Sequence, residues 1–315
     1  MANELEYATI FQQELDKQVV AQATSGWMEA NAGLVKYNGG NEVKIPKINM
    51  DGLGKYDRAT GFVGGSVTLE YETKTLTQDR GRTFMLDRMD VDETNFVATA
   101  ANVMGEFQRT QVVPEIDAYR YSSISAQAIA AGSARGGYDP DAETILSEIK
   151  KDIHDIYDVA GEVPLVITVS MPVWAIISNS TEIMKFLSVI DFSRGEVKTK
   201  VRGIDENPII PVPSARMKTK YVFYDGKTAG QEAGGFVADT NKAKNINWII
   251  TPRTAPIAIS KTDKIRIFEP DTNQQADAWK IDYRKYHDLW IKENQLAAIR
   301  VNIKEALEEE EMLDE

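Results

Sequence analysis

The chain of 315 residues contains no cysteine and only two histidines, His154 and His287. The lack of cysteine excludes disulfides, thiolate nucleophiles and cysteine-ligated metals. His154 lies beside Asp152 and Asp155 in a predicted helix, away from its isoleucine stripe. A single titratable residue does not make a site, so we expect a solvated or salt-linked histidine there rather than a catalytic base.

The usual sequence signatures of enzymes are also absent. There is no GxSxG, GxxxxGK[ST] or HExxH motif, and no GxGxxG follows a strand. Residues 139–143 resemble the start of a calcium loop, but Thr144 and Lys150 stand where glycine and the last acidic ligand are needed. Residues 90–93 could bind a divalent ion, but they precede a predicted helix. Helix capping explains both acidic clusters better. We therefore predict a protein that is not an enzyme, with no catalytic residue, cofactor or metal.

No apolar run approaches the length needed to span a bilayer. The first residues, MANELEYATI, are acidic where a secretory signal is basic, so we expect a protein made and kept in a cytoplasm, or in something assembled there. The net charge of −12 argues against a general nucleic-acid binder. One basic strip, Lys198, Lys200 and Arg202, could touch nucleic acid or an acidic partner. A solvated strand edge is the better interpretation.

The apolar pattern divides the chain into distinct parts. Residues 1–41 read as an arm with a short amphipathic helix. Residues 42–76 alternate like two strands around a glycine-rich tip and predict a long hairpin. An isolated hairpin is marginally stable at best, so we expect this one to lie on something else. A long helix follows from about residue 92, and Pro114 should kink or divide it.

The second half alternates between helices and strands. A helix is predicted to open at Asp139-Pro140 and to end before Gly161. The apolar run VPLVITVS predicts a strand covered on both faces, and another helix should begin at Ser170. These elements indicate a small α/β lobe over residues 136–260. The last third returns to strands, and the acidic tail at 305–315 should fray.

The segment TQDRGRTFMLDRMDVDETN, residues 77–95, carries an unusual density of both signs of charge. Three functions fit such a segment: a catalytic cluster, a phosphate grip, or half of a contact between subunits. The lack of catalytic partners leaves the catalytic cluster with little support. Arginine pairs with carboxylates through two parallel hydrogen bonds, and this pairing suits a contact between subunits.

Three stretches together resemble the major capsid proteins of tailed bacteriophages and their prophages. They are TLTQDRGRTFMLDRMDVDET, NVMGEFQRTQVVPEIDAYRYS and DAWKIDYRKYHDLWI. The order of elements fits the same family over about residues 7–303. The resemblance implies an α+β fold with a long spine helix, an extended hairpin called the E-loop, and an α/β axial domain.

The resemblance also implies domain boundaries. The expected parts are an N-terminal arm at 1–41, the E-loop at 42–88, a peripheral domain at 89–135 and 261–304, an axial domain at 136–260, and the tail at 305–315. Many relatives carry a cleaved scaffolding segment before the arm. The arm here begins almost at Met1, so we expect either a mature form or a separate scaffold.

On this resemblance the charged segment lies where subunits meet. The expected contact residues are Asp79, Arg80, Arg82, Asp87, Arg88, Asp90, Glu106, Arg109, Glu115, Asp117, Arg120, Asp282 and Arg284. The alternative is that these charges brace their own subunit. Some relatives cross-link a lysine to an asparagine. Lys55 is the candidate lysine, although an inert exposed lysine is the better interpretation.

The implied function is self-assembly into hexamers and pentamers that form an icosahedral shell around double-stranded DNA, with the protein located in the virion after assembly in the host cytoplasm. Expected partners are other copies of the chain and a portal, with scaffolding or decoration proteins as further candidates. DNA would be enclosed without sequence-specific binding, and no membrane is involved. The nearest alternative is the shell of an encapsulin-type nanocompartment that encloses an enzyme. A small-molecule enzyme built on the α/β lobe and a monomeric binding module are weaker alternatives.

Overall fold

The computed structural model describes residues 23–34, 36–37, 42–58, 61–88, 103–194 and 197–307. The predicted helix of the arm, Asp90 and the acidic cluster at 90–93, and the last eight residues of the tail lie outside these ranges. Within them, no helix combines the length and hydropathy that a membrane crossing requires.

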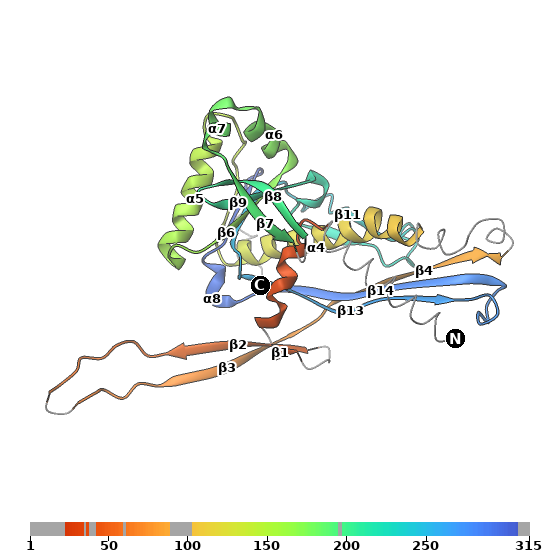
Figure 1. The fold of residues 1–315 in the computed structure, drawn as a ribbon, viewed down its shortest axis with the longest axis horizontal. Helices are drawn as coiled ribbons and strands as arrows, with labels where there is room; N and C mark the ends of the chain where they lie inside the picture. Colours follow the sequence, from red (N-terminus) through yellow and green to blue (C-terminus); the bar gives the residue numbers. More distant parts are fainter. Residues whose placement is uncertain are drawn as a thin grey trace.

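A long helix runs through the middle of the molecule, between an upper lobe and a lower sheet (Figure 1). It comprises a helical turn from residue 103, the π-helical turn η2 (Gln108–Val112) and α4 (Val113–Ala130). Of the two outcomes expected at Pro114, a kink or a division, division does not occur, since the chain continues helically through the proline. Proline cannot donate to the preceding turn. The chain adapts by widening that turn, and the amide of Val113 donates to the carbonyl of Gln108.

The upper lobe is built on one mixed sheet. In spatial order its strands are β5 (Ala134–Arg135), β15 (Arg300–Ile303), β12 (Ile246–Pro252), β6 (Leu165–Ser170), β9 (Asn207–Val212), β8 (Val197–Ile204) and β7 (Ser188–Arg194). Every residue of β6 is buried, as the apolar run predicts. β15 pairs with β12 in this sheet, so residues 300–303 lie in the lobe and not with the late strands of the expected peripheral domain.

Three helices cover this sheet: α5 (Ile145–Ala160), α6 (Met171–Asn179) and α7 (Thr181–Phe186). The isoleucine stripe of α5 is buried in the lobe core with Trp248. The helix begins at Ile145, later than predicted. Asp141 accepts hydrogen bonds from the amides of Glu143 and Thr144 and so holds a turn before it. Gly161 ends α5 with a positive φ of 73°.

Short elements complete the lobe and its edges. They are η3 (Ser214–Arg216), the two-stranded sheet of β10 (Tyr221–Phe223) and β11 (Phe236–Ala238), and α8 (Glu293–Leu296). The loop between β10 and β11 is rich in glycine and lies against the charged segment described below.

The lower sheet has three antiparallel strands: β13 (Pro256–Phe268), β14 (Ala278–Ile291) and β4 (Gln78–Asp87). The long strand β14 lies in the centre and pairs with both neighbours along almost its whole length. Ile281 and Tyr283 of β14 pack against Val113 and Ile116 of α4. The charged residues 78–87 therefore form a strand of this sheet, bound to the late strands and not to the hairpin.

The hairpin consists of β2 (Glu42–Met50) and β3 (Val67–Thr75), with the short β1 (Lys36–Tyr37) beside β2. It extends away from the rest of the molecule (Figure 1). Only its base is buried: Val43 and Ile45 pack against Ile257, Ile259 and Trp290. Each such aliphatic side chain contributes about 1.5–3 kcal/mol when fully buried. The base is therefore anchored, and the remainder reaches into solvent.

The segment before the hairpin, η1 (Gly26–Leu34), is joined to the spine helix by a buried carboxylate. Asp117 accepts hydrogen bonds from the amides and hydroxyls of Thr24 and Ser25 at 2.6–3.1 Å, and from Arg216 at 3.0 Å. Arg120 is also buried and donates to Glu29 at 2.6 Å. Arg120 holds the pKa of Glu29 below its usual value, although burial acts in the opposite direction.

These positions correct part of the expected contact surface. Asp117 and Arg120 are both 0% exposed and bind groups of their own subunit, so neither side chain can reach a neighbour. Buried charges need internal partners because removing a charge from water costs several kcal/mol. The sequence alone placed both residues on the spine helix without showing which face they occupy.

Replacing Asp117 by alanine should reduce the free energy of unfolding by about 3–5 kcal/mol, because Arg216 and four donors would lose a buried partner. Urea denaturation of the unassembled chain, followed by tryptophan fluorescence, measures this change. The control is Glu106→Gln, which removes an exposed pair with Arg109 and should leave the midpoint unchanged. Equal stability of Asp117→Ala and the wild type would contradict the role of this carboxylate.

Candidate functional site

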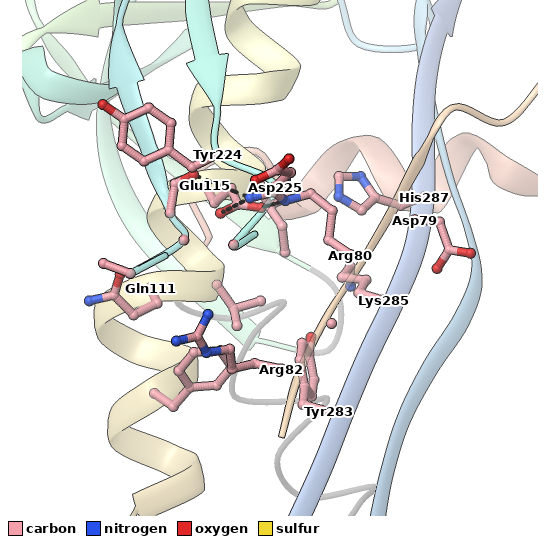
Figure 2. Close-up of a pocket in the computed structure, with 18 of the residues that line it drawn as sticks. Asp79, Arg80, Arg82, Gln111, Glu115, Tyr224, Asp225, Tyr283, Lys285 and His287 are labelled. Atoms are coloured by element: carbon pink, nitrogen blue, oxygen red, sulfur yellow. Dashed lines mark hydrogen bonds and ion pairs between the residues drawn. The ribbon is translucent and has the colours of Figure 1, made fainter. Parts of the chain in front are cut away.

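The charged segment alternates along β4, so its residues face two environments. Arg80, Arg82, Phe84 and Leu86 share the face toward the spine helix, while Asp79 and Thr83 lie on the other face. Figure 2 shows Arg80 and His287 directed into the space beside α4, whereas Asp79 points away from it.

Arg80 joins three parts of the same subunit. Its guanidinium pairs with Glu115 of α4 and donates to the carbonyl of Gly235 at 3.2 Å. It also lies over the ring of Phe223 in β10, 5.7 Å from the centroid. The strand, the spine and the glycine-rich loop are thus held together by one side chain.

Arg82 contacts the same loop two residues further along β4. Its Nη1 donates to the carbonyl of Glu232 at 3.1 Å. Gly226 and Gly234 have positive φ angles of 72° and 69°, and a Cβ on either would lie 3.3–3.4 Å from that Nη1. The loop approaches the guanidinium through backbone positions that glycine alone adopts easily.

The other face of β4 is bound to β14 by side chains. Arg284 donates to both carboxylate oxygens of Asp79, at 2.8 and 2.5 Å, and this hydrogen bonding holds the pKa of Asp79 below its usual value. Thr83 donates to Asp282 at 2.9 Å, and Arg266 lies 3.6 Å from the same carboxylate. These exposed pairs align the strands in register.

The remaining predicted contact residues lie at the surface. Arg88 is 3.5 Å from both Asp271 and Asp277, at the end of the β13–β14 hairpin. Asp87 is exposed. Glu106 and Arg109 form a pair at 2.7 Å on the first turns of the spine. Their side chains are about three-fifths exposed, so both are accessible to a second molecule.

A recess of about 530 Å³ opens between β4, the spine helix and the glycine-rich loop (Figure 2). Phe84, Phe107 and Tyr283 line it with aromatic rings, and Phe107 meets the other two edge to face. A second recess of about 590 Å³ adjoins it and shares Arg82 and Asp225. The carboxylate of Asp225 accepts hydrogen bonds from the backbone amides of Thr228 and Lys227, and these bonds lower its pKa to about 2.

His287 lies at the deep end of the first recess and is almost fully buried. Its Nδ1 has no hydrogen-bond partner. Burial, together with the positive charges of Lys285, Arg120 and Arg80, holds the pKa of His287 well below its usual value, so the ring is neutral near pH 7. Lys285 is paired with Asp263 at 2.5 Å. Two carboxylates that line the same recess are also paired: Glu115 with Arg80, and Asp79 with Arg284.

The other candidates from the sequence have ordinary surroundings. His154 is exposed on α5. Lys200 and Arg202 are exposed on β8, which pairs with β7 at the end of the lobe sheet. Across the ranges that the structure describes, no group of three or more histidine, cysteine, aspartate or glutamate side chains could hold a metal ion.

Sequence reasoning did not identify the glycine-rich loop at 224–235 as the counterpart of the charged strand. Its signal is the density of Gly226, Gly230, Gly234 and Gly235, which all have positive φ angles. Nor did it find Thr24 and Ser25 as partners of Asp117, because two small polar residues before a helix carry no distinguishing pattern.

No protein-family model and no curated protein matches this sequence. Solved structures do. The capsid of cyanophage P-SCSP1u aligns with a TM-score of 0.54 at 11% identity, covering 84% of this chain and 83% of that one. The chain has the phage capsid fold. The bacteriophage PhiM1 mature capsid aligns with a TM-score of 0.50 at 12% identity over 84% and 82%.

A virus-like particle from Pyrococcus furiosus also aligns, with a TM-score of 0.51 at 10% identity over 93% of this chain and 98% of that one. The expected α+β capsid fold is therefore confirmed. Identities this low establish the fold alone, and the chemistry of the site has to come from the residues of this chain.

His287 should make the unassembled chain less stable as the pH falls below about 6.5, the pKa of an unperturbed histidine. The unfolded chain then binds a proton that the buried ring in the folded chain does not, so the free energy of unfolding should fall by up to about 1.4 kcal/mol per pH unit. Urea denaturation of wild type and His287→Gln at about pH 7.5 and about pH 5.5 measures this difference. An identical loss in both proteins would contradict the prediction.

Gly81 should resist substitution because β14 passes close to it. A Cβ there would lie 2.7 Å from the carbonyl oxygen of Tyr283, so Gly81→Val should separate the strands and reduce stability by about 1–3 kcal/mol. Thermal unfolding of the unassembled chain provides the measurement. The matched control is Gly52→Val, where nothing lies within 4 Å of the added carbon. If Gly81→Val lost no more stability than Gly52→Val, the close approach of β14 to Gly81 would be contradicted.

Proposed function

We propose that this chain is a major capsid protein, which self-assembles into hexamers and pentamers and forms an icosahedral head shell around phage double-stranded DNA. The observation that carries the proposal is the long hairpin of β2 and β3, whose apolar side chains beyond the buried base have no cover from the residues that the structure describes. The capsid fold of the solved structures supports the same conclusion.

The exposed apolar residues concentrate on the hairpin and its tip. Leu53 is fully exposed, Phe62 is 91% exposed, and Met50 and Val67 are each 71% exposed. Tyr56 and Phe62 stack edge to face at 4.9 Å across the tip. A contiguous apolar surface of this kind is rare on a monomeric protein and marks a binding surface. A neighbouring copy of the chain would supply the missing cover.

Heterologous contacts of this type close into rings, and rings close into a shell. Each subunit is then held at several places, so individually weak contacts give a durable particle. We assign the β2–β3 hairpin to the E-loop, the spine helix and lower sheet to the peripheral domain, and the upper lobe to the axial domain. β4, which was expected in the E-loop, belongs to the lower sheet. β15, which was expected in the peripheral domain, belongs to the upper lobe.

The partners follow from this role. They are other copies of the chain and a portal, with scaffolding or decoration proteins as further candidates, within a virion assembled in the host cytoplasm. Arg82, Asp87, Arg88, Glu106, Arg109, Asp282 and Arg284 remain candidates for contacts between subunits. The net charge of −12 suits a shell that encloses DNA without gripping it, since like charges repel.

One observation favours a second candidate, the shell of an encapsulin-type nanocompartment. The virus-like particle from Pyrococcus furiosus covers more of this chain than either phage capsid described above. Its TM-score does not exceed that of the cyanophage capsid, so the alignment alone does not favour one shell over the other. Particle contents distinguish them, because a nanocompartment would carry an enzyme and a phage head would carry DNA.

Light scattering coupled to size exclusion of the purified chain, with negative-stain microscopy of the large fraction, tests the proposal. Closed shells or discrete rings of five or six subunits are expected. If only monomer forms, co-expression with a separate scaffold protein is the second step. A monomer that persists there would contradict assembly as the function.

The double variant Leu53→Asp with Phe62→Asp should prevent assembly, because it places charge on an apolar surface that a neighbour has to cover. Sedimentation of assembled particles measures the effect, and at least a tenfold loss of the assembled fraction is expected, or about 1.4 kcal/mol. The control, Leu53→Met with Phe62→Leu, keeps the surface apolar and should assemble. Both variants should unfold at the wild-type urea concentration, and normal shells from the aspartate variant would refute this role of the hairpin.

A further inference from the structure

The arginines around the two recesses differ in one respect. Arg80 pairs with Glu115, Arg284 with Asp79, and Arg266 with Asp282. Arg82 forms no ion pair with a carboxylate anywhere in the part of the chain that the structure describes. Among the described residues, its one hydrogen bond goes to a backbone carbonyl, that of Glu232.

The carboxylates near Arg82 are committed elsewhere. Glu232, whose carbonyl binds Arg82, directs its own carboxylate to the amide of Gly230 at 2.9 Å. Asp225 accepts two amides and the hydroxyl of Thr228. Asp282 accepts the hydroxyl of Thr83. Each of these three carboxylates, the described acidic groups beside Arg82, is thus bound to a donor other than Arg82.

The guanidinium is nevertheless held in place. The positive-φ glycines of the loop lie against Nη1, and the hydrogen bond to Glu232 fixes the direction of the group. Arg82 is exposed and lines both recesses, with the ring of Tyr283 beside it (Figure 2). A positioned arginine with free donors binds a carboxylate at a lower entropic cost than a mobile lysine does.

We propose that Arg82 anchors a contact between subunits, where it receives a carboxylate from a second copy of this chain inserted at the mouth of the recess. The inference rests on the proposed assembly and adds the residue and the chemistry of one contact. Charge complementarity favours a second copy, because the chain has 48 acidic residues against 36 basic ones and so supplies carboxylates in excess.

Carbodiimide coupling tests the pairing directly, because it joins an amine to a carboxylate in contact with it. Particles are assembled without nucleic acid from equal amounts of ¹⁴N- and ¹⁵N-labelled Arg82→Lys chain, coupled, digested and analysed by mass spectrometry. The expected product joins position 82 to an aspartate or glutamate in isotopically mixed pairs. The control is the native pair of Lys47 and Glu293, which lie 2.7 Å apart in the same chain and should give unmixed links.

Charge reversal gives a second readout. Arg82→Glu should raise the concentration needed for assembly at least about tenfold, whereas Arg82→Lys should assemble nearly as wild type. Urea denaturation of the unassembled variants shows whether the loop and strand still fold normally. The coupling experiment identifies the acidic partner of position 82. Replacing that acidic residue by lysine should restore assembly of Arg82→Glu.

The outcomes separate this inference from the function on which it rests. A chain that never assembles contradicts the proposed function and this contact with it. Particles with isotopically mixed links elsewhere, but only unmixed links or none at position 82, contradict the Arg82 contact alone. Normal assembly of Arg82→Glu would also contradict the Arg82 contact. Binding of another anion, such as a DNA phosphate, would then be the alternative role of this arginine.

Discussion

The buried carboxylate of Asp117 is the interaction on which the arrangement of this subunit depends. A charge removed from water must be matched nearby, and here the matching groups come from two other parts of the chain, so that three parts meet at one carboxylate. Thr24 and Ser25 precede the hairpin, Asp117 lies on the spine helix, and Arg216 belongs to the upper lobe. Because one group binds all three, neither the lobe nor the N-terminal segment can move from the spine without exposing an unpaired charge.

The hairpin presents the opposite situation. Its base is buried against the lower sheet, and Lys47 and Glu293 pair at 2.7 Å beside it, but its outer half exposes aliphatic and aromatic side chains to water. The chain thus satisfies its buried charges internally and leaves part of its apolar surface uncovered. That division is expected of a protein whose folding is completed by its neighbours. It explains how an anchored subunit can carry an element that would be unstable alone.

Local patterns predicted the elements well where one face is buried. The alternation in residues 42–76 gave the hairpin, the isoleucine stripe gave α5, and the apolar run gave the covered strand β6. Each of these signals follows from the period of its own element. The signal failed at Pro114, where the helix widened a turn and continued, because packing of Val113 and Ile116 against the lower sheet outweighs a local proline preference.

Long-range pairing was harder to predict. Nothing in the sequence of β15 distinguishes a strand of the lobe sheet from an extension of the lower sheet, since a short strand with two buried apolar residues, Val301 and Ile303, fits either. The same holds for charges: Arg80 and Glu115 were both expected at contacts, and they meet within one subunit. The sequence shows that complementary charged groups are present. The fold determines which of these groups lie close enough to pair.

The charged strand therefore serves two purposes, and strand geometry separates them. Alternation puts Asp79 and Thr83 on the face where β14 supplies partners, and puts Arg80 and Arg82 toward the spine and the loop. On that second face, Arg80 pairs with Glu115 of the spine helix. Arg82 lies one strand repeat further along, beyond the reach of any acidic residue that the helix presents in the described structure. A position that braces the subunit and a position open to a neighbour are thus separated by a single pleat.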